Sequence, residues 1–276
     1  MRHRGVLADG QLGVRHRYLG RGVCRALDPS RPHQSPRIHW LISDTDRWWH
    51  RFKRIGDIAI IHVDLVSDQE REANALAWLD GEERSRWQRF QSPVAQRRYV
   101  LCRAALRAVL SREVGCPNES LAFEAAKHGK PFALVDGQPA SISFNVSHSG
   151  SHGLIAVAPI GRLGVDVEER APRRNLDNLI EGVFSPQERA ELESLEGCEQ
   201  LHVFFRFWTI KEALVKAHGK GLSMKVAELE IPEEMRRGAI RCIGQFAQIP
   251  ETSWCLEDIG TSDFAAAVAH EVSPSS

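Results

Sequence analysis

Residues 207–222 constrain the fold more than any other part of this chain, because they combine a helical period with a clear helix end. Apolar residues recur at helical spacing and should face the protein interior: Val203, Phe207, Ile210 and Leu214. Glu212 and Lys216 fall one turn apart on the opposite side of this helix. Gly219 and Gly221 indicate its C-terminal end, because glycine readily adopts the left-handed conformation of a helix cap.

The Glu212–Lys216 pair has an ordinary interpretation and a functional one. Pairs at this spacing are most often solvated, and such a pair stabilises a helix by only about 0.2–0.5 kcal/mol. The functional interpretation requires other charged residues to meet the pair in the folded protein. The choice between the two therefore depends on motifs elsewhere in the chain.

Length, charge and cysteine spacing limit the class of protein. A chain of 276 residues forms one larger domain or two small domains packed together. The formal net charge of +0 excludes an overall field that would favour nucleic acid or an anionic membrane. No apolar run approaches the ~20 residues that a membrane-spanning helix needs. The six cysteines form no close pair, which favours free thiols in a reducing compartment and predicts a cytoplasmic protein.

The first 37 residues differ from the rest of the chain. They contain eight Arg and two Asp without a clear period, which predicts a disordered tail in residues 1–37. They lack the apolar centre of a secretory signal, and they resemble an organelle transit peptide only loosely. The folded sequence is expected to form an N-terminal subdomain at 38–158 and a C-terminal subdomain at 163–272, with a hinge at 159–162.

Helical and strand patterns alternate in both parts of the folded sequence. In the first part we expect a strand at 58–65, helices at 80–90 and 96–112, and strands at 141–146 and 152–158. In the second part we expect a strand at 163–168, helices at 175–183, from 185 and over the segment described first, and strands at 239–248, 253–258 and 263–270. This order predicts an α+β fold with mostly antiparallel strands.

Two polar segments of the first part are candidates for binding. The segment 147–150 (SHSG) is expected to form a turn in which His148 lies between two hydroxyls, an arrangement suited to an anionic group. The helix at 96–112 carries Arg98, Arg103 and Arg107 on the side opposite its apolar stripe. A solvated helix face is the more common explanation for such arginines.

The strand at 163–168 (LGVDVE) places two carboxylates together. Side chains alternate along a strand, so Asp166 and Glu168 share the face opposite Val165 and Val167. Two neighbouring carboxylates repel each other, and a divalent cation is the simplest compensation. An exposed strand edge with two solvated acids is an equally acceptable alternative.

Together with Glu212, these two residues form a set of three acids. Carboxylate oxygens select a hard cation such as Mg²⁺, which completes its coordination with water and phosphate oxygens. Lys216, one turn from Glu212, would bring a positive charge to the same phosphates. The combination predicts pyrophosphate or phosphoryl chemistry, in which catalysis consists mainly of positioning and charge neutralisation.

Two segments about forty residues apart resemble the signature motifs of the 4′-phosphopantetheinyl transferases of the surfactin-synthetase-activating (Sfp) type. They are GVDVE at 164–168 and WTIKEALVK at 208–216, the latter followed by GKGL at 219–222. The segments FNVSHS at 144–149 and GKP at 129–131 add to the resemblance. The resemblance implies two similar α+β subdomains related by a pseudo-twofold axis, with coenzyme A bound in the cleft between them.

The resemblance also implies roles for individual residues. Asp166, Glu168 and Glu212 are expected to hold Mg²⁺ on the pyrophosphate of coenzyme A, which Asp166 and Lys216 also help to bind. Lys216 and Glu212 are the expected catalytic residues, and Glu212 acts as base, metal ligand or both. The other expected contacts to coenzyme A are Arg86, Arg98, Lys130, Ser147 and His148.

The implied activity is transfer of the 4′-phosphopantetheine group from coenzyme A to a serine of an apo acyl or peptidyl carrier protein, with release of 3′,5′-ADP. Such carriers are acidic, and Arg103 and Arg107 are candidates for a basic patch that attracts them. A non-catalytic carrier-protein or nucleotide-binding module of the same fold is the main alternative. Another Mg²⁺-dependent phosphotransferase is a second one. We expect a monomer with no nucleic-acid or membrane partner.

Overall fold

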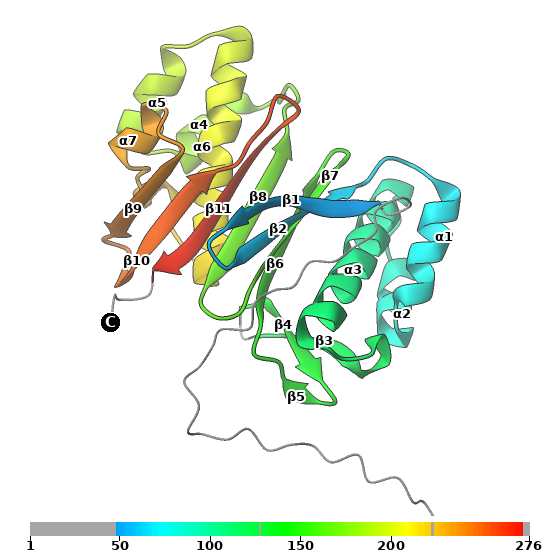
Figure 1. Ribbon diagram of the computed structural model, residues 1–276. Helices are drawn as coiled ribbons and strands as arrows, with labels where there is room; N and C mark the ends of the chain where they lie inside the picture. The colour runs from blue at the N-terminus through cyan, green and yellow to red at the C-terminus, as the bar shows by residue number, and fades with distance from the viewer. Residues whose placement is uncertain (1–47, 127, 222–223, 273–276) are drawn as a thin grey trace, which may run out of the picture. The chain divides into compact units, whose positions relative to one another are not determined.

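The sheets of this protein are best followed in the computed structural model, which describes residues 48–126, 128–221 and 224–272 (Figure 1). The predicted disordered tail at 1–37 lies outside the described residues. Within those residues no helix combines the length and the apolar character needed to cross a membrane.

The N-terminal half is built on a four-stranded antiparallel sheet. Its strands are β1 (Trp49–Ile55), β2 (Ile58–Asp64), β7 (His152–Ala158) and β6 (Ser143–Ser149), in that spatial order. The helices α1 (Gln69–Trp78), α2 (Gly81–Gln88) and α3 (Pro93–Val114) accompany this sheet. A short 3₁₀ turn η1 (Asn118–Ser120) leads to a smaller sheet of β3 (Leu121–Ala125), β4 (Pro131–Val135) and β5 (Gln138–Pro139).

The C-terminal half repeats the plan of a four-stranded antiparallel sheet and one long helix. Its strands are β8 (Leu163–Glu169), β11 (Phe264–Val272), β10 (Ile249–Asp258) and β9 (Arg241–Phe246), in that spatial order. The long helix α6 (Gly197–His218) packs on β8 and β11 (Figure 1). The shorter elements are α4 (Leu176–Val183), α5 (Pro186–Glu193), η3 (Val226–Glu228) and α7 (Glu233–Arg236). The protein is therefore α+β, with two similar halves.

Each half has its own apolar core, and a third core joins them. In the joining core, Val165 and Val167 of β8 pack with Leu154 and Ala156 of β7. The edge strands β6 and β8 lie side by side, and β7 also contacts β8. The two halves thus meet along an apolar layer beneath the polar side chains that the next subsection describes.

The structure confirms the helix signals and corrects the prediction for 147–150. Asp80 and Ser185 cap α2 and α5 through capping boxes, and Gly219 caps α6 with a positive φ of 86°. The segment 147–150 is not a turn throughout. Ser147, His148 and Ser149 continue β6 and pair with β7, so that only Gly150 and Ser151 connect the two strands. A two-residue hairpin loop needs positive φ, and Gly150 supplies it with a φ of 55°.

The basic patch predicted on α3 is wrong. Arg107 is 1% exposed, and its guanidinium contacts Asp80 and Glu83 at 3.1 and 2.9 Å. It also donates hydrogen bonds to the carbonyls of Asn118 and Leu121. Arg103 lies over the ring of Phe123 and 3.4 Å from Glu83. Both cations are held inside the N-terminal half because α2 and β3 cover this side of α3.

Candidate active site at the junction of β6, β8 and α6

A close approach of α6 to β8 brings the two motifs together. A Cβ atom at Gly164 would overlap the carbonyl of Ala213 and the amide of Ala217, so only glycine allows this packing. The alternation of β8 directs Val165 and Val167 into the core between the halves. It therefore directs Asp166 toward α6.

Lys216 pairs with Asp166 rather than with Glu212. Its Nζ atom lies 2.6 Å from Asp166 Oδ1 and donates to Ser147 Oγ at 2.9 Å. Ser147 Oγ also contacts Asp166 Oδ1 at 2.7 Å, so the three polar groups form a closed cluster. Because Ser147 belongs to β6, this cluster links the N-terminal half to the C-terminal half. The solvated Glu212–Lys216 pair of the ordinary interpretation is not what the structure contains.

Alternate residues of β6 continue this link along β8. Asn145 Oδ1 accepts a hydrogen bond from the amide of Val165 at 2.9 Å. Ser149 Oγ donates to Glu168 Oε2 at 2.6 Å. The edge strands β6 and β8 are thus joined through side chains at the positions where a continuous sheet would use backbone pairs.

Burial and mutual repulsion shift the pKa values of two of the acids. Burial raises the pKa of Glu212, and the nearby charges of Asp166 and Glu168 raise it further, while Lys216 opposes them. Burial also raises the pKa of Glu168, although the Ser149 hydroxyl and Arg173 favour its charged form. Arg173 lies 3.1 Å from Glu168. The site therefore holds negative charge that nearby cations compensate only in part.

The three acids fit a hard divalent cation. Asp166 Oδ2 is buried and has no hydrogen-bond partner among the described residues. A buried carboxylate oxygen without a partner is unfavourable, and a cation would satisfy it. The donor atoms of the three carboxylates do not all lie within 4.8 Å of one another. Binding by all three would thus require Glu212 or Glu168 to change rotamer.

A pocket of about 290 Å³ adjoins this cluster. Glu212, Val215 and Lys216 of α6 line one side of it. Asn145 and Val146 of β6 and the segment 128–131 line the other. The predicted catalytic pair therefore faces a space large enough for a small chain-like group.

Lys130, predicted to contact coenzyme A, is engaged with the backbone. Its Nζ atom donates to the carbonyl oxygens of Leu163 and Ala217 at 2.8 and 3.1 Å. Burial, with the nearby charge of Arg162, lowers the pKa of Lys130 to about 8. In this arrangement Lys130 ties the loop before β4 to the C-terminal end of α6.

Arg98 and His148 lie on one flank of the cluster. Arg98 Nε donates to the carbonyl oxygen of Gly150 at 3.0 Å. The pKa of His148 is lowered, first by partial burial and then by the charges of Arg98 and Lys216. Both side chains are thus close enough to the cluster to influence an anion bound there.

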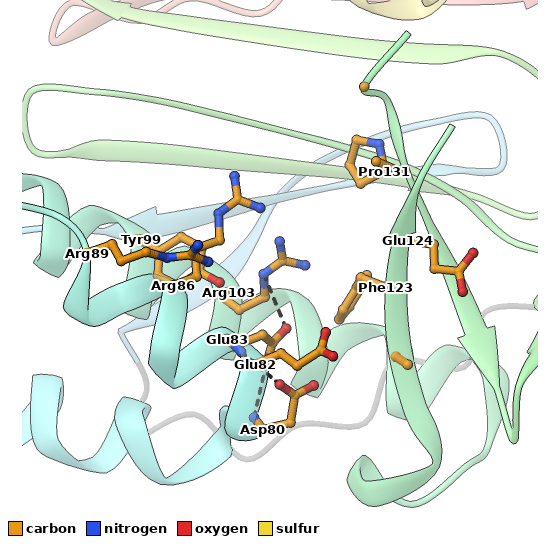
Figure 2. Close-up of a pocket in the computed structure, with 13 residues that line it drawn as sticks. Asp80, Glu82, Glu83, Arg86, Arg89, Tyr99, Arg103, Phe123, Glu124 and Pro131 are labelled. Atoms are coloured by element: carbon orange, nitrogen blue, oxygen red, sulfur yellow. Dashed lines mark hydrogen bonds and ion pairs between the residues drawn. The ribbon is translucent and has the colours of Figure 1, made fainter. Parts of the chain in front are cut away.

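Arg86 belongs to a second pocket, of about 430 Å³ (Figure 2). Figure 2 shows Arg86, Arg89 and Arg103 beside the ring of Tyr99, with Phe123 on β3 across the pocket. The Arg86 and Arg103 guanidiniums lie 5.7 and 5.8 Å from the Tyr99 ring centre. The same pocket is also lined by four carboxylates, those of Asp80, Glu82, Glu83 and Glu124, so its charge is mixed. Of the predicted contacts to coenzyme A, Arg86 lines this pocket, and Lys130 and Lys216 line the 290 Å³ pocket.

Several residues that hold the site were not identified from the sequence. They are Asn145, Ser149, Arg173, Glu188 and Lys211. Lys211 Nζ lies 2.6 Å from Glu188 Oε2, and the two side chains are 1% and 0% exposed. The alternating polar residues of FNVSHS signalled both Asn145, which lies in the strand predicted at 141–146, and Ser149, which the turn predicted at 147–150 removed from that strand. Nothing local to Lys211 signals that it is buried.

The comparison with known families and proteins agrees with this geometry. A model described as the 4′-phosphopantetheinyl transferase superfamily matches residues 162–269, and one described as 4′-phosphopantetheinyl transferase, N-terminal, matches residues 67–160. A putative 4′-phosphopantetheinyl transferase of Synechocystis is 41% identical over 57% of this chain and 63% of its own length, slightly less than two thirds.

Two further relatives extend the comparison. The 4′-phosphopantetheinyl transferase HetI of Nostoc is 31% identical over 63% of this chain and 73% of its own length. Sfp of Bacillus subtilis is 28% identical over 62% of this chain and 74% of its own length. The acidic motifs of this chain meet at the junction of two similar halves. The chain belongs to the 4′-phosphopantetheinyl transferase superfamily, and within it to the Sfp type.

Proposed function

We propose that this chain transfers the 4′-phosphopantetheine group of coenzyme A to a serine of an apo acyl or peptidyl carrier protein. The serine oxygen forms a bond to the phosphorus that carries pantetheine. The bond from that phosphorus to the bridging oxygen of the pyrophosphate breaks, and 3′,5′-ADP leaves with that oxygen. The observation that carries this proposal is the cluster of Ser147, Asp166 and Lys216, which joins both halves beside Glu212.

Glu212 is the proposed general base. A serine hydroxyl is a weak nucleophile at neutral pH and needs a group that accepts its proton. Burial and the neighbouring carboxylates raise the pKa of Glu212, and a higher pKa makes a carboxylate a stronger base. Glu212 also lines the 290 Å³ pocket, where the serine of a carrier could approach it.

Lys216 is proposed to bind the pyrophosphate and the leaving phosphate. Its ammonium already neutralises Asp166, so it can turn toward a more highly charged ligand without losing its place on α6. Positive groups fixed where charge develops account for a large share of catalysis in phosphoryl transfer.

Asp166, Glu168 and Glu212 are the proposed holders of Mg²⁺. When bound, this ion would neutralise charge on the pyrophosphate and fix its orientation. The unpaired Oδ2 atom of Asp166 supports this assignment. Ser147 and Ser149 then orient Asp166 and Glu168 through the hydrogen bonds described above.

The nucleotide end of coenzyme A is proposed to use the remaining basic residues. Arg98 and His148, with Ser147, flank the acidic cluster and suit the 3′-phosphate region. Arg86, beside the ring of Tyr99 in the 430 Å³ pocket, is proposed to contact the nucleotide further out. Lys130 is bonded to two carbonyls, so a direct contact to phosphate would require it to leave them.

The alternatives differ from this proposal in the expected products. A non-catalytic module would bind coenzyme A without releasing 3′,5′-ADP, and the intact set of acids and Lys216 does not favour it. Another Mg²⁺-dependent phosphotransferase would leave carrier proteins unmodified. A monomeric state, a cytoplasmic location and the absence of nucleic-acid or membrane partners remain predictions.

The test is incubation with coenzyme A, Mg²⁺ and a panel of apo carrier proteins from fatty-acid, polyketide and peptide synthases. Intact mass should show addition of one phosphopantetheine group to at least one carrier. Glu212→Gln should lower the rate by about 10²–10⁴-fold, the usual contribution of a general base. Glu199→Gln, exposed at the start of the same helix, is the matched control and should retain full activity.

Two results would contradict the proposal. One is the absence of a mass gain on every carrier of the panel. The other is full activity of the Glu212→Gln variant. The pattern of carriers that gain mass would identify the class of synthase that this enzyme serves.

A further inference from the structure

Strands β10 and β11 bring a cysteine, a glutamate and a histidine together, far from the acidic cluster in sequence. Cys255 and His270 are directly opposite each other in the antiparallel ladder. Glu257 lies two residues from Cys255 and therefore on the same face of the sheet. One donor atom from each of the three side chains lies within 4.8 Å of the other two. Among the described residues, this is the one group of three such side chains that meets this distance.

The burial of the group is typical of a built site rather than of a surface coincidence. Cys255 is fully buried and Glu257 is 9% exposed. The Nε2 atom of His270 is buried and has no hydrogen-bond partner among the described residues. A buried ring nitrogen without a partner is unfavourable unless something else satisfies it.

The contact made by the other ring nitrogen of His270 indicates the tautomer of the ring. Its Nδ1 atom lies 3.2 Å from the backbone carbonyl oxygen of Glu271, which can only accept a hydrogen bond. Nδ1 is then protonated, and Nε2 carries a lone pair. Metal-binding histidines commonly show this arrangement, in which a carbonyl orients the ring and leaves the second nitrogen for the ion.

The position of Arg241 indicates that the group of Cys255, Glu257 and His270 attracts a cation. Its Nε atom lies 3.3 Å from Cys255 Sγ and 3.4 Å from Glu257 Oε1. Its side chain is 58% exposed, so it can move into solvent when an ion takes its place. The guanidinium therefore provides the positive charge that the thiol and the carboxylate attract.

We propose that Cys255, Glu257 and His270 form a zinc site that clamps β11 to β10. Cysteine sulfur, histidine nitrogen and carboxylate oxygen all bind Zn²⁺, and with three protein ligands the fourth position of the tetrahedron is left for water. Binding releases the thiol proton to solvent and forms a bond from the thiolate to zinc. The strand alternation places this group on the face of the sheet opposite Asp166, because Asp166 pairs with Ala267 and His270 pairs with Leu163. The zinc site is therefore independent of the proposed transfer reaction.

The first measurement uses Co²⁺ as a spectroscopic substitute for Zn²⁺ on metal-free protein. One equivalent should produce a thiolate-to-cobalt charge-transfer band, and added Zn²⁺ should remove it. An excess of Mg²⁺ should leave the band unchanged. Carboxylates alone give no thiolate band, so binding at the acidic cluster cannot imitate this signal. Its absence at stoichiometric Co²⁺ would overturn the proposal.

Variants assign the band to Cys255 and His270. Cys255→Ser and His270→Gln should each abolish or strongly weaken it. Cys242→Ser should retain it, because Cys242 pairs with Leu256 and so lies on the other face of the sheet. Either variant of the cluster suffices if the other fails to fold. A band that persists in Cys255→Ser or His270→Gln would refute the assignment.

Thermal unfolding provides an independent measurement. At a Zn²⁺ concentration about a hundredfold above the dissociation constant, Tm should rise by roughly 5–10 °C. The rise should vanish in His270→Gln and persist in Cys242→Ser. An equal rise in all three proteins would show that zinc acts elsewhere and would contradict the proposal.

Discussion

The two halves of this enzyme share one arrangement, a buried ion pair between a long helix and the capping box of a short helix. They differ in the other charged residues of the long helix. In the N-terminal half, Glu83 completes the capping box of α2 and pairs with Arg107 of α3 at 2.9 Å. In the C-terminal half, Glu188 completes the capping box of α5 and pairs with Lys211 of α6 at 2.6 Å. Both long helices are thus tied to the start of a short helix by a buried cation.

On α6 a second cation reaches across to the other half. Lys216 meets Asp166 and Ser147, whereas Arg103 of α3 stays within its own half against Glu83 and Phe123. The long helix also packs more closely on the sheet in the C-terminal half than in the N-terminal half. A Cβ atom at Gly153 of β7 would meet the side chain of Cys102 at 2.8 Å, but at Gly164 of β8 it would meet the backbone of α6. A repeated scaffold thus provides stability in both halves, and the closer helix of the C-terminal half adds the residues proposed for catalysis.

Replacing Lys216 by Met should have the largest effect on activity of all the changes considered. A small effect would contradict the difference between the two halves. The turnover number should fall about 10²–10³-fold, because one fixed positive group at the reacting phosphates is lost. The measurement is the rate of carrier modification at saturating coenzyme A, with circular dichroism to verify the fold. A loss of less than about tenfold would mean that Lys216 is structural, as Lys211 is.

Replacing Lys211 by Met, only five residues away, should act on stability. It leaves Glu188, which is 0% exposed, without its cation, and breaking such a buried pair lowers the free energy of unfolding by about 3–5 kcal/mol. Urea denaturation provides the measurement. Arg107→Met should lose somewhat less, because its partner Glu83 is 10% exposed whereas Glu188 is 0% exposed.

The control for the buried pairs is an exposed one. Lys225 and Glu228 form an ion pair in water, and Lys225→Met should leave the urea midpoint unchanged. If Lys211→Met proved as stable as this control, the buried ion pairs at the capping boxes would not be what holds the two long helices.

His62 of the N-terminal half, which the C-terminal half contacts, should make the protein less stable in acid. Burial, together with His50 and His152, lowers the pKa of His62 from 6.5 to about 4. The unfolded chain therefore binds more protons between pH 6.5 and 4, and stability falls as the pH decreases through this range. Because His62 is only partly buried, solvent screens part of this effect, and the loss amounts to about 1–2 kcal/mol.

Urea denaturation at pH 7 and at pH 5 tests the histidine. His62→Gln should remove most of this part of the pH dependence, because no group at that position then gains a proton on unfolding. His128→Gln, an exposed histidine, serves as the control and should behave as the unaltered protein does. A pH dependence that is the same in both variants would assign the effect to other groups.

Local patterns were sufficient for most elements and for the acidic motif. The period of two in LGVDVE placed Asp166 and Glu168 on one face, and SPQE predicted the capping box that begins α5. The helical period identified α6 and the inward side of Phe207, Ile210 and Leu214. These features depend on neighbours within one or two turns or pleats, which the sequence displays directly.

The errors arose where a residue's partner lies on another element. Arg107 is polar and lies opposite the apolar stripe of α3, so its own helix predicts exposure, yet α2 and β3 cover it. Ser147 begins a segment with the composition of a turn, but pairing with Leu154 of β7 keeps this residue in a strand. No spacing within one helix could indicate that Lys216 pairs with Asp166, fifty residues away.

The sequence by itself thus determined the class of fold, the residues of both acidic motifs and the inward sides of β8 and α6. Only the tertiary structure decided which charges meet, because strand register and helix packing join segments far apart in the chain. Cys255 and His270 illustrate the difference, since their spacing resembles no metal motif until the ladder of β10 and β11 places them opposite each other. Periodicity reports the direction of a side chain, whereas its electrostatic partner depends on the whole fold.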